Sequence, residues 1–262
     1  MSPFKEMDVE SRRQYIANCE LESCPPPSAL FVQDAPVTTD ELAKGVVVDS
    51  NLLAFTPGTS AEVIEDVNDC MLFATLVANK AFNPEQQNTE WFAKYNEVLS
   101  FLGWAPAELK YYQAGNESQT LSMDRIVLDM LKTALLAATL PGPTSAIMIG
   151  TATRMIDRLR TSDQPLRLFE RQSKHQQGAN FRVGACDESD DGVVNMVVSS
   201  VNFRSSSQAV NVLFVSWGRG EAEVYGASYN LRFNRRHYES VQADVRRKLT
   251  ADARRNIEAF DI

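Results

Sequence analysis

The chain has 262 residues, of which 44% are hydrophobic and 23% are charged, and its formal net charge is −8 at pH 7. This composition is that of a globular protein and excludes collagen-like and disordered chains. A chain of this length buries roughly 70–75% of its unfolded surface, so it needs no disulfide or metal for stability. Four cysteines without a Cys-x-x-Cys pair favour reduced, buried thiols, although Cys19 and Cys24 are close enough to bridge a short loop.

The first ten residues contain Lys5, Glu6, Asp8 and Glu10 and no apolar stretch of the kind that a secretory signal contains. We therefore expect a cytoplasmic protein, or one that is exported without a cleavable signal peptide.

Charge and hydrophobic pattern both change near residue 162. Residues 1–164 hold 12 Lys and Arg against 22 Asp and Glu, whereas residues 165–262 hold 14 against 12. Helical spacing of apolar residues dominates before this point and two-residue alternation after it. We expect three regions that pack as one unit: an irregular arm with short strands over 1–59, a helical region over 60–162, and a sheet with a terminal helix over 163–262.

Prolines at 25–27 interrupt the arm and restrict it to short strands. Ser60 is a suitable N-cap for the helix that follows, and the Pro-Gly-Pro sequence at 141–143 predicts a reversal between two longer helices. The predicted strands of the arm are Ala29–Val32, Val46–Val48 and Leu52–Phe55, and the predicted helices cover 60–83, 84–102, 106–112, 120–140 and 143–161.

The sequence after residue 165 shows the pattern of β-strands joined by short links that are rich in Gly, Asp and Ser. The predicted strands are Leu166–Arg171, Ala179–Cys186, Val193–Phe203, Ala209–Trp217 and Ala222–Phe233. Short links predict an antiparallel meander, and the third and fourth strands are apolar on both faces and should be covered on both sides. An amphipathic helix over Arg236–Phe260 closes the chain. The expected class is α+β, with a helical half packed on an antiparallel, sandwich-like sheet.

The segment Thr133–Thr153 holds no charged residue. Its two arms are too short to cross the hydrocarbon core of a bilayer, which takes about 20 residues. Small residues favour a buried helical hairpin. The alternative is an apolar tip, formed by Ala146, Ile147, Met148 and Ile149, that inserts shallowly in a membrane or docks a partner.

The terminal helix is rich in cations. Arg247, Lys248, Arg254 and Arg255 form a basic face that is either solvated or in contact with a protein partner or an anionic membrane surface. Nucleic acid is not an expected partner, because a molecule with a net charge of −8 is poorly attracted to phosphate.

Catalytic signatures are absent, and no cofactor is expected. Only two histidines exist, so a nucleophile–base pair would have to combine Cys186 with His175 across a predicted hairpin. The acidic loop from Asp187 to Asp191 follows the first positions of an EF-hand, but position twelve is Val198 instead of Glu. A hairpin turn is the favoured interpretation, and a weak metal site at Asp187 and Asp191 is the alternative.

These observations favour a non-enzymatic interaction protein, and the apolar hairpin and basic helix favour a bacterial toxin-associated or virulence-associated component. Tyr225, Tyr229 and Trp217 could anchor a partner if they are exposed. Two alternatives stay open: a cysteine-dependent hydrolase or transferase that uses Cys186 and His175, and a cytosolic structural subunit.

Overall fold

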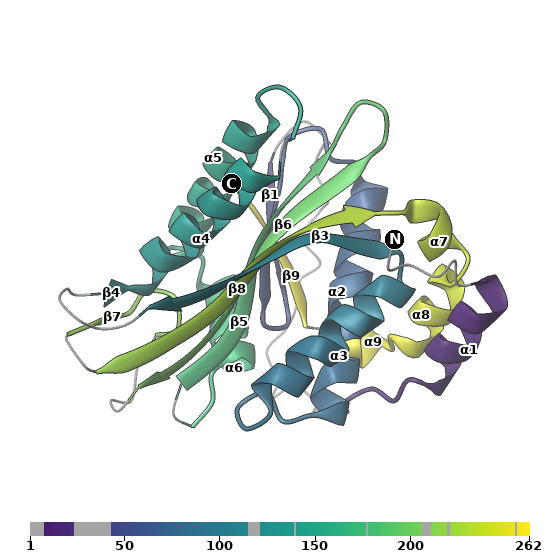
Figure 1. Ribbon diagram of the computed structural model, residues 1–262, viewed down its shortest axis with the longest axis horizontal. Coiled ribbons are helices and arrows are strands. Elements are labelled where there is room, and N and C mark those ends of the chain that lie inside the picture. Colours follow the sequence, from purple (N-terminus) through teal and green to yellow (C-terminus); the bar gives the residue numbers. More distant parts are fainter. Residues whose placement is uncertain are drawn as a thin grey trace.

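The computed structural model describes residues 8–23, 43–114, 121–138, 140–176, 178–205, 211–218, 221–254 and 256–262. Within these ranges the core of the molecule is a seven-stranded sheet in the order β3-β8-β6-β5-β2-β1-β9 (Figure 1). Its strands are β1 (Lys44–Val48), β2 (Asn51–Phe55), β3 (Trp104–Ala114), β5 (Gly178–Glu188), β6 (Val194–Ser205), β8 (Ala222–Phe233) and β9 (Ile257–Asp261). Each of the three sequence regions contributes strands to it.

Most neighbouring strands of the sheet are antiparallel. β5, β6 and β8, three of the five strands predicted for the meander, pair antiparallel in this order, and β1 and β2 form a hairpin. The exception is β2, which pairs with β5 in parallel and so joins the N-terminal hairpin to the meander. The α+β class is confirmed, as are the strands predicted at Val46–Val48 and Leu52–Phe55. The strand predicted at Ala29–Val32 lies outside the described residues.

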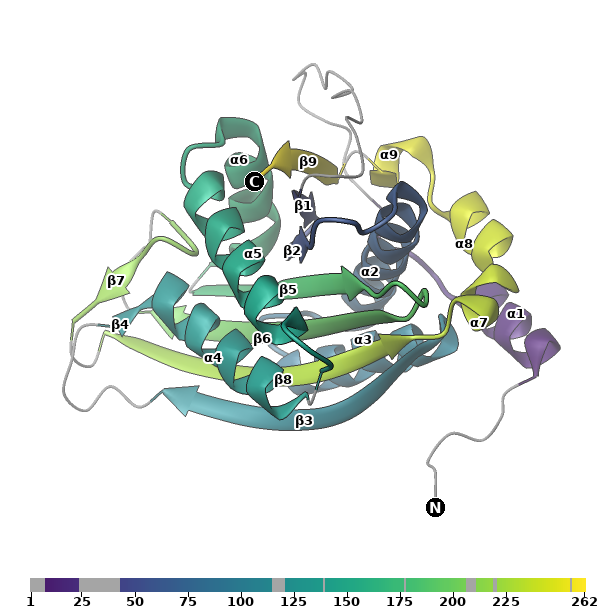
Figure 2. The ribbon, with the colours of Figure 1, turned by 90° about the horizontal axis from the view of Figure 1, so that it is seen from above.

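Helices cover both faces of the sheet (Figures 1 and 2). On one face lie α2 (Ala61–Ala81) and α3 (Asn88–Phe101), and on the other lie α4 (Met123–Ala137), α5 (Thr144–Leu159) and α6 (Asp163–Ser173). β6 supplies Met196 and Val198 to the first apolar cluster and Val197 and Val201 to the second. The prediction that this strand is central and covered on both sides is therefore confirmed.

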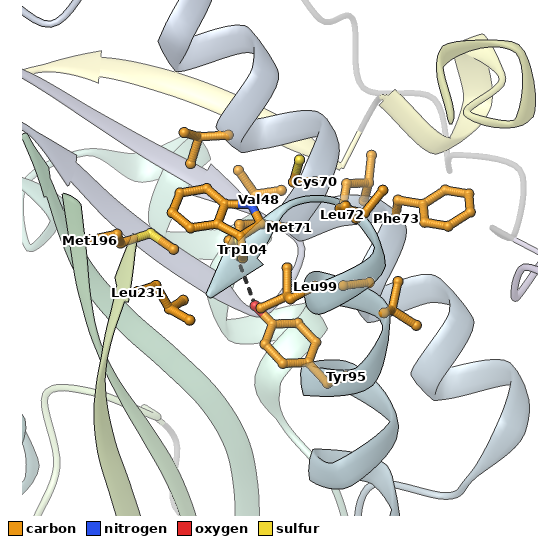
Figure 3. Close-up of a cluster of buried hydrophobic side chains, with 14 of the residues drawn as sticks. Val48, Cys70, Met71, Leu72, Phe73, Tyr95, Leu99, Trp104, Met196 and Leu231 are labelled. Carbon is orange, nitrogen blue, oxygen red and sulfur yellow. Dashed lines mark hydrogen bonds between the residues drawn. The ribbon is translucent and has the colours of Figure 1, made fainter. Parts of the chain in front are cut away.

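The cluster on the α2 face is closely packed around aromatic side chains. Figure 3 shows Trp104 at the start of β3 between α2 and the sheet, beside Cys70 and Met71. Trp104 also stacks on Phe233, with ring centroids 4.3 Å apart. The Tyr95 hydroxyl donates to the Met71 sulfur at 3.0 Å, which ties α3 to α2.

The C-terminal segment differs from the single helix predicted over Arg236–Phe260. It consists of three short helices and a strand: α7 (Arg235–Glu239), α8 (Gln242–Lys248), α9 (Ala251–Arg254) and β9. Five apolar side chains of the three helices, Tyr238, Val241, Val245, Leu249 and Ala253, are nevertheless buried, because these helices bend around α2 and the N-terminal helix α1 (Val9–Asn18). The Thr250 hydroxyl accepts from the backbone N–H of Ala253 at 3.3 Å and so starts α9, and the last residues then pair with β1.

Three further predictions of secondary structure are wrong. The helix expected over 106–112 is part of β3, where Pro106 is tolerated because β3 is an edge strand with a bulge at this point. The strand expected over Leu166–Arg171 is α6, which has Pro165 in its first turn. Of the strand expected over Ala209–Trp217, only β7 (Ser216–Trp217) forms among the described residues, and it pairs with β4 (Leu121–Ser122) outside the large sheet.

A buried cation lies near the centre of the sheet. Arg182 on β5 is 1% exposed, and its guanidinium donates to Asn51 at 3.0 Å, to Asn180 at 3.2 Å and to Ser50. The same group lies 4.4 Å from the centroid of the Trp91 ring on α3. Neutral acceptors and an aromatic face therefore satisfy a charge that would otherwise be expensive to bury.

Asp49 is a buried carboxylate next to Ser50, which accepts from Arg182. It occupies the β1–β2 turn with φ of +54°, is 4% exposed, and accepts from Ser50 N–H at 2.8 Å and from the Asn256 amide at 3.3 Å. Burial raises the pKa of Asp49 to about 6, although the Arg182 charge acts in the opposite direction. The native state thus retains a proton on this group at a pH where the unfolded chain has lost it.

Replacing Asp49 by Asn should remove this pH dependence. The stabilisation from a raised carboxyl pKa is complete below about pH 4 and is lost as the pH rises through about 6. Asn stays neutral and tolerates the positive φ. Relative to the wild type, Asp49→Asn should therefore gain about 2 kcal/mol of unfolding free energy between pH 4 and pH 7.

Urea denaturation at the two pH values measures this difference, and Asp157→Asn, which removes an exposed carboxylate on α5, is the control. A stability difference between Asp49→Asn and wild type that does not change with pH would contradict the assignment.

Candidate interaction surface

The uncharged segment forms a helical hairpin from α4 and α5. Most of its apolar side chains pack on the sheet: Leu135, Met148 and Ala152 are at most 1% exposed. Within the described ranges, no helix is both long enough and apolar enough to cross a membrane. The packed-hairpin prediction is therefore confirmed for the body of the hairpin, including Met148.

The end of the same hairpin is different. Leu136 is 79% exposed and Ile147 is 43% exposed, and Ala146 is exposed beside them. The Ser145 hydroxyl donates to the Leu135 carbonyl at 3.3 Å, which holds the last turn of α4 against the first turn of α5. We use the name hairpin tip for the described residues that share this end of the hairpin, which are Leu136, Leu140–Pro143, Ala146 and Ile147.

Two cations lie behind the hairpin tip. Lys132 is one turn before Leu136 on α4, and Arg154 is two turns after Ile147 on α5, and both are exposed. At 1.5 Å per residue, they lie about 6 Å and about 10 Å along their helices from the exposed apolar side chains. The Lys132 ammonium has an exposed ion pair with Asp129 at 3.6 Å. The outer face of the hairpin is therefore apolar at its end, and behind this end it carries Arg154 and the Lys132–Asp129 ion pair.

The basic residues predicted as a contact surface are elsewhere and mostly occupied. Arg254 pairs with Asp69 at 3.0 Å, and the Lys248 ammonium donates to the carbonyls of Ala17 and Cys19 at 2.7 and 2.6 Å. Arg247 is exposed and, among the described residues, forms an ion pair with Asp244 on its own helix. Arg255 lies outside the described residues. These helices lie on the α2 side of the sheet and the hairpin on the other, so the two candidate surfaces are not joined (Figure 1).

The ion pairs of the terminal helices converge on two buried carboxylates of α2. Asp66 and Asp69 are at most 1% exposed. Arg246 contacts both, at 3.2 and 3.0 Å, and Arg235 reaches Asp66 at 3.5 Å. Burial raises the pKa of both carboxyl groups and the arginines act against it. Sequence reasoning paired neither carboxylate with an arginine, because the arginine partners are distant in sequence.

Reversing the charge of Arg254 should destabilise the fold. Arg254→Glu places a carboxylate against buried Asp69, and we expect it to lower the unfolding free energy by about 2 kcal/mol. Arg247→Glu is the matched control, because Arg247 is 72% exposed and should change stability by less than about 0.5 kcal/mol. Thermal unfolding followed by circular dichroism measures both. Equal effects of the two variants would contradict a structural role for Arg254.

The candidate catalytic pair is not assembled. His175 lies beside Gly178 at the start of β5, with its N–H donating to the Gly178 carbonyl at 2.9 Å. Cys186 lies eight residues along the same strand, about 26 Å away at 3.3 Å per residue. Cys186 is fully buried, and burial raises the pKa of its thiol. The two residues therefore do not form a nucleophile and base.

The acidic loop is a turn between β5 and β6. Its backbone closes with Ser189 N–H donating to the Val193 carbonyl at 2.9 Å, and Gly192 has φ of +76°. Asp187 accepts from the Thr56 hydroxyl at 2.7 Å, while Asp191 accepts from Ser189 at 2.5 Å. Their carboxylates thus have different partners, and the described residues contain no cluster of three or more His, Cys, Asp or Glu that could hold a metal.

Of the three aromatic residues considered as anchors, two are buried. Trp217 and Tyr229 are each 2% exposed and belong to the two apolar clusters. Tyr225 is 42% exposed, near Tyr111 at 81% and Tyr112 at 39% on the neighbouring strand β3. Sequence reasoning missed the β3 tyrosines because it assigned them to a helix.

Comparison with known proteins gives distant structural similarity only. No protein-family model and no curated protein matches the chain. A solved structure titled delta-endotoxin is 11% identical, with a TM-score of 0.43 over 82% of this chain and 91% of that chain. Another, titled "Structure of the Evf virulence factor", is 13% identical, with a TM-score of 0.32 over 98% of this chain and 92% of that chain. Similarity at this level assigns neither a family nor a function.

Proposed function

We propose that this protein is a non-enzymatic interaction protein that binds the surface of an anionic membrane through its hairpin tip. The observation that carries the proposal is the exposure of Leu136 and Ile147 at the end of an otherwise packed, uncharged hairpin. The toxin-associated or virulence-associated role is part of the same proposal, because an apolar hairpin end that is exposed to water is suited to inserting into a membrane.

The magnitudes favour weak and reversible binding. Burying the exposed parts of Leu136 and Ile147 contributes about 3 kcal/mol. Lys132 and Arg154, at headgroup level behind the hairpin tip, add about 1 kcal/mol each on an anionic surface. Neither contribution alone is sufficient to hold the protein on a vesicle, so binding should require both apolar insertion and anionic lipid.

The geometry favours shallow insertion. Amphipathic elements that lie in the interface bury their apolar face about 5–10 Å deep. The distances from Leu136 to Lys132 and from Ile147 to Arg154 along the helices, about 6 and 10 Å, fall in this range. With the hairpin tip in the acyl boundary, both cations would lie among the headgroup phosphates while the body of the hairpin stays packed on the sheet.

Co-flotation with vesicles tests the proposal. Wild-type protein should float with phosphatidylglycerol-containing vesicles at low salt and should bind phosphatidylcholine vesicles little. The double variant Leu136→Asp with Ile147→Asp should lose at least about tenfold in the bound fraction, because it places two charges in the acyl boundary. Val9→Asp is the matched control, because Val9 is 49% exposed on α1, away from the hairpin.

Three results would count against this function. The membrane hypothesis fails if wild-type protein does not float with anionic vesicles at pH 5 or pH 7, and a protein partner then becomes the occupant of the hairpin tip. It also fails if the double variant floats as well as wild type. Equal loss in Val9→Asp would show that binding does not depend on the hairpin tip.

A further inference from the structure

The second exposed apolar surface lies at an edge of the sheet. β3 pairs with β8 on one side, and no strand among the described residues pairs with its other side. Figure 2 shows β3 running along the outside of the molecule. An edge of this kind presents unpaired backbone N–H and C=O groups, which form a template for another strand.

The side chains at this edge are aromatic. Tyr111 is 81% exposed, more than any other large hydrophobic residue of the described chain, and it lies opposite Ala227 of β8. Tyr225 lies opposite Gln113, so it is the diagonal neighbour of Tyr111 on the same face of the sheet. Tyr112 points to the other face because side chains alternate along a strand. Both faces of the edge therefore carry exposed tyrosines.

Only the second half of β3 is suited to further pairing. Pro106 has no N–H to donate, and the register with β8 shifts between Pro106 and Leu109. From Leu109 to Ala114 the pairing with β8 is regular and contains no proline. A strand added at this edge would therefore pair within residues 109–114.

We propose that a second copy of this chain pairs with β3, antiparallel and about a two-fold axis at Tyr111, so that one sheet continues through both copies. In this register Tyr111 lies opposite Tyr111 of the other copy, and Lys110 lies opposite Tyr112. An interface about a two-fold axis must be complementary to itself, and this pairing satisfies that condition. The exposed faces of Tyr111 and Tyr225 from each copy then form one aromatic stripe across the junction.

The charge of Lys110 and the regular pairing after Leu109 favour the axis at Tyr111 over axes at the neighbouring residues. An axis at Lys110 would place two ammonium groups directly opposite each other, which is destabilising. An axis at Leu109 would extend the pairing into the bulge that precedes it. An axis at Tyr112 would leave Lys110 opposite Ala114. The axis at Tyr111 instead places each Lys110 beside the Tyr112 ring of the other copy, an arrangement that suits a cation–π contact.

Cross-linking through an introduced cysteine tests the register. Directly opposite residues of antiparallel strands have Cα atoms about 4.5–5.5 Å apart, within the range of about 4.4–6.8 Å that a disulfide bridges. Under mild oxidation Tyr111→Cys should form a covalent dimer on a non-reducing gel. Tyr225→Cys, on the neighbouring strand, is the matched control and should remain at the level of the unsubstituted protein, which sets the baseline for the native cysteines.

Sedimentation analysis gives an independent readout. Wild-type protein should sediment as a dimer, and Tyr111→Asp, which places two carboxylates opposite each other, should sediment as a folded monomer. A wild-type protein that is monomeric at the concentration used for cross-linking would overturn the proposal. So would cross-linking through Tyr112→Cys in place of Tyr111→Cys, or equal cross-linking through Tyr225→Cys.

Discussion

The architecture depends on one constraint: the central sheet is apolar on both faces and must be covered on both. Successive side chains of β6 point to opposite faces of the sheet: Met196 and Val198 belong to the apolar cluster on the α2 face, and Val197 belongs to the cluster on the α4 face. Meeting the constraint uses the inner faces of α2, α3, α4 and α5. Few large apolar side chains of the described residues stay exposed, and most of these lie at the hairpin tip or on β3 and the adjoining part of β8. The proposed membrane contact and the proposed contact between two copies of the chain both use these exposed side chains, which the helices do not cover.

Buried charge serves the fold and leaves little of the C-terminal basic surface for binding. Arg182 is held by neutral acceptors and an aromatic ring at the centre of the sheet. Asp66 and Asp69 occupy the arginines of the terminal helices, which fastens these helices to α2. Among the described residues, the cations beside the exposed apolar end of the hairpin are Lys132, whose partner Asp129 lies on the same helix, and Arg154. The ion-pair partners and the exposure of the basic side chains therefore identify a binding surface better than the number of basic residues in a segment does.

The sequence predicted the elements whose pattern is local. The Ser60 cap, the α2 helix and the strands β5, β6 and β8 follow from spacing and turn residues, and they are confirmed. Residues 106–112 and 166–171 were assigned to the wrong element because their short apolar runs fit either a helix or a strand, and tertiary position decided. The uncharged hairpin was visible in the sequence. Its division into a packed body and an exposed tip was not, because that depends on where the sheet ends.

The central claim, that the hairpin tip is the part that enters a membrane, is tested most directly by measuring depth. An environment-sensitive fluorophore attached at Ile147→Cys reports the polarity around the hairpin tip, and the same label at Arg247→Cys reports the opposite side of the sheet. Adding anionic vesicles should shift the Ile147 emission to the blue and make it quenchable by acyl-chain quenchers, with no change at Arg247. Quenching at Arg247 alone, or at both positions equally, would contradict the account.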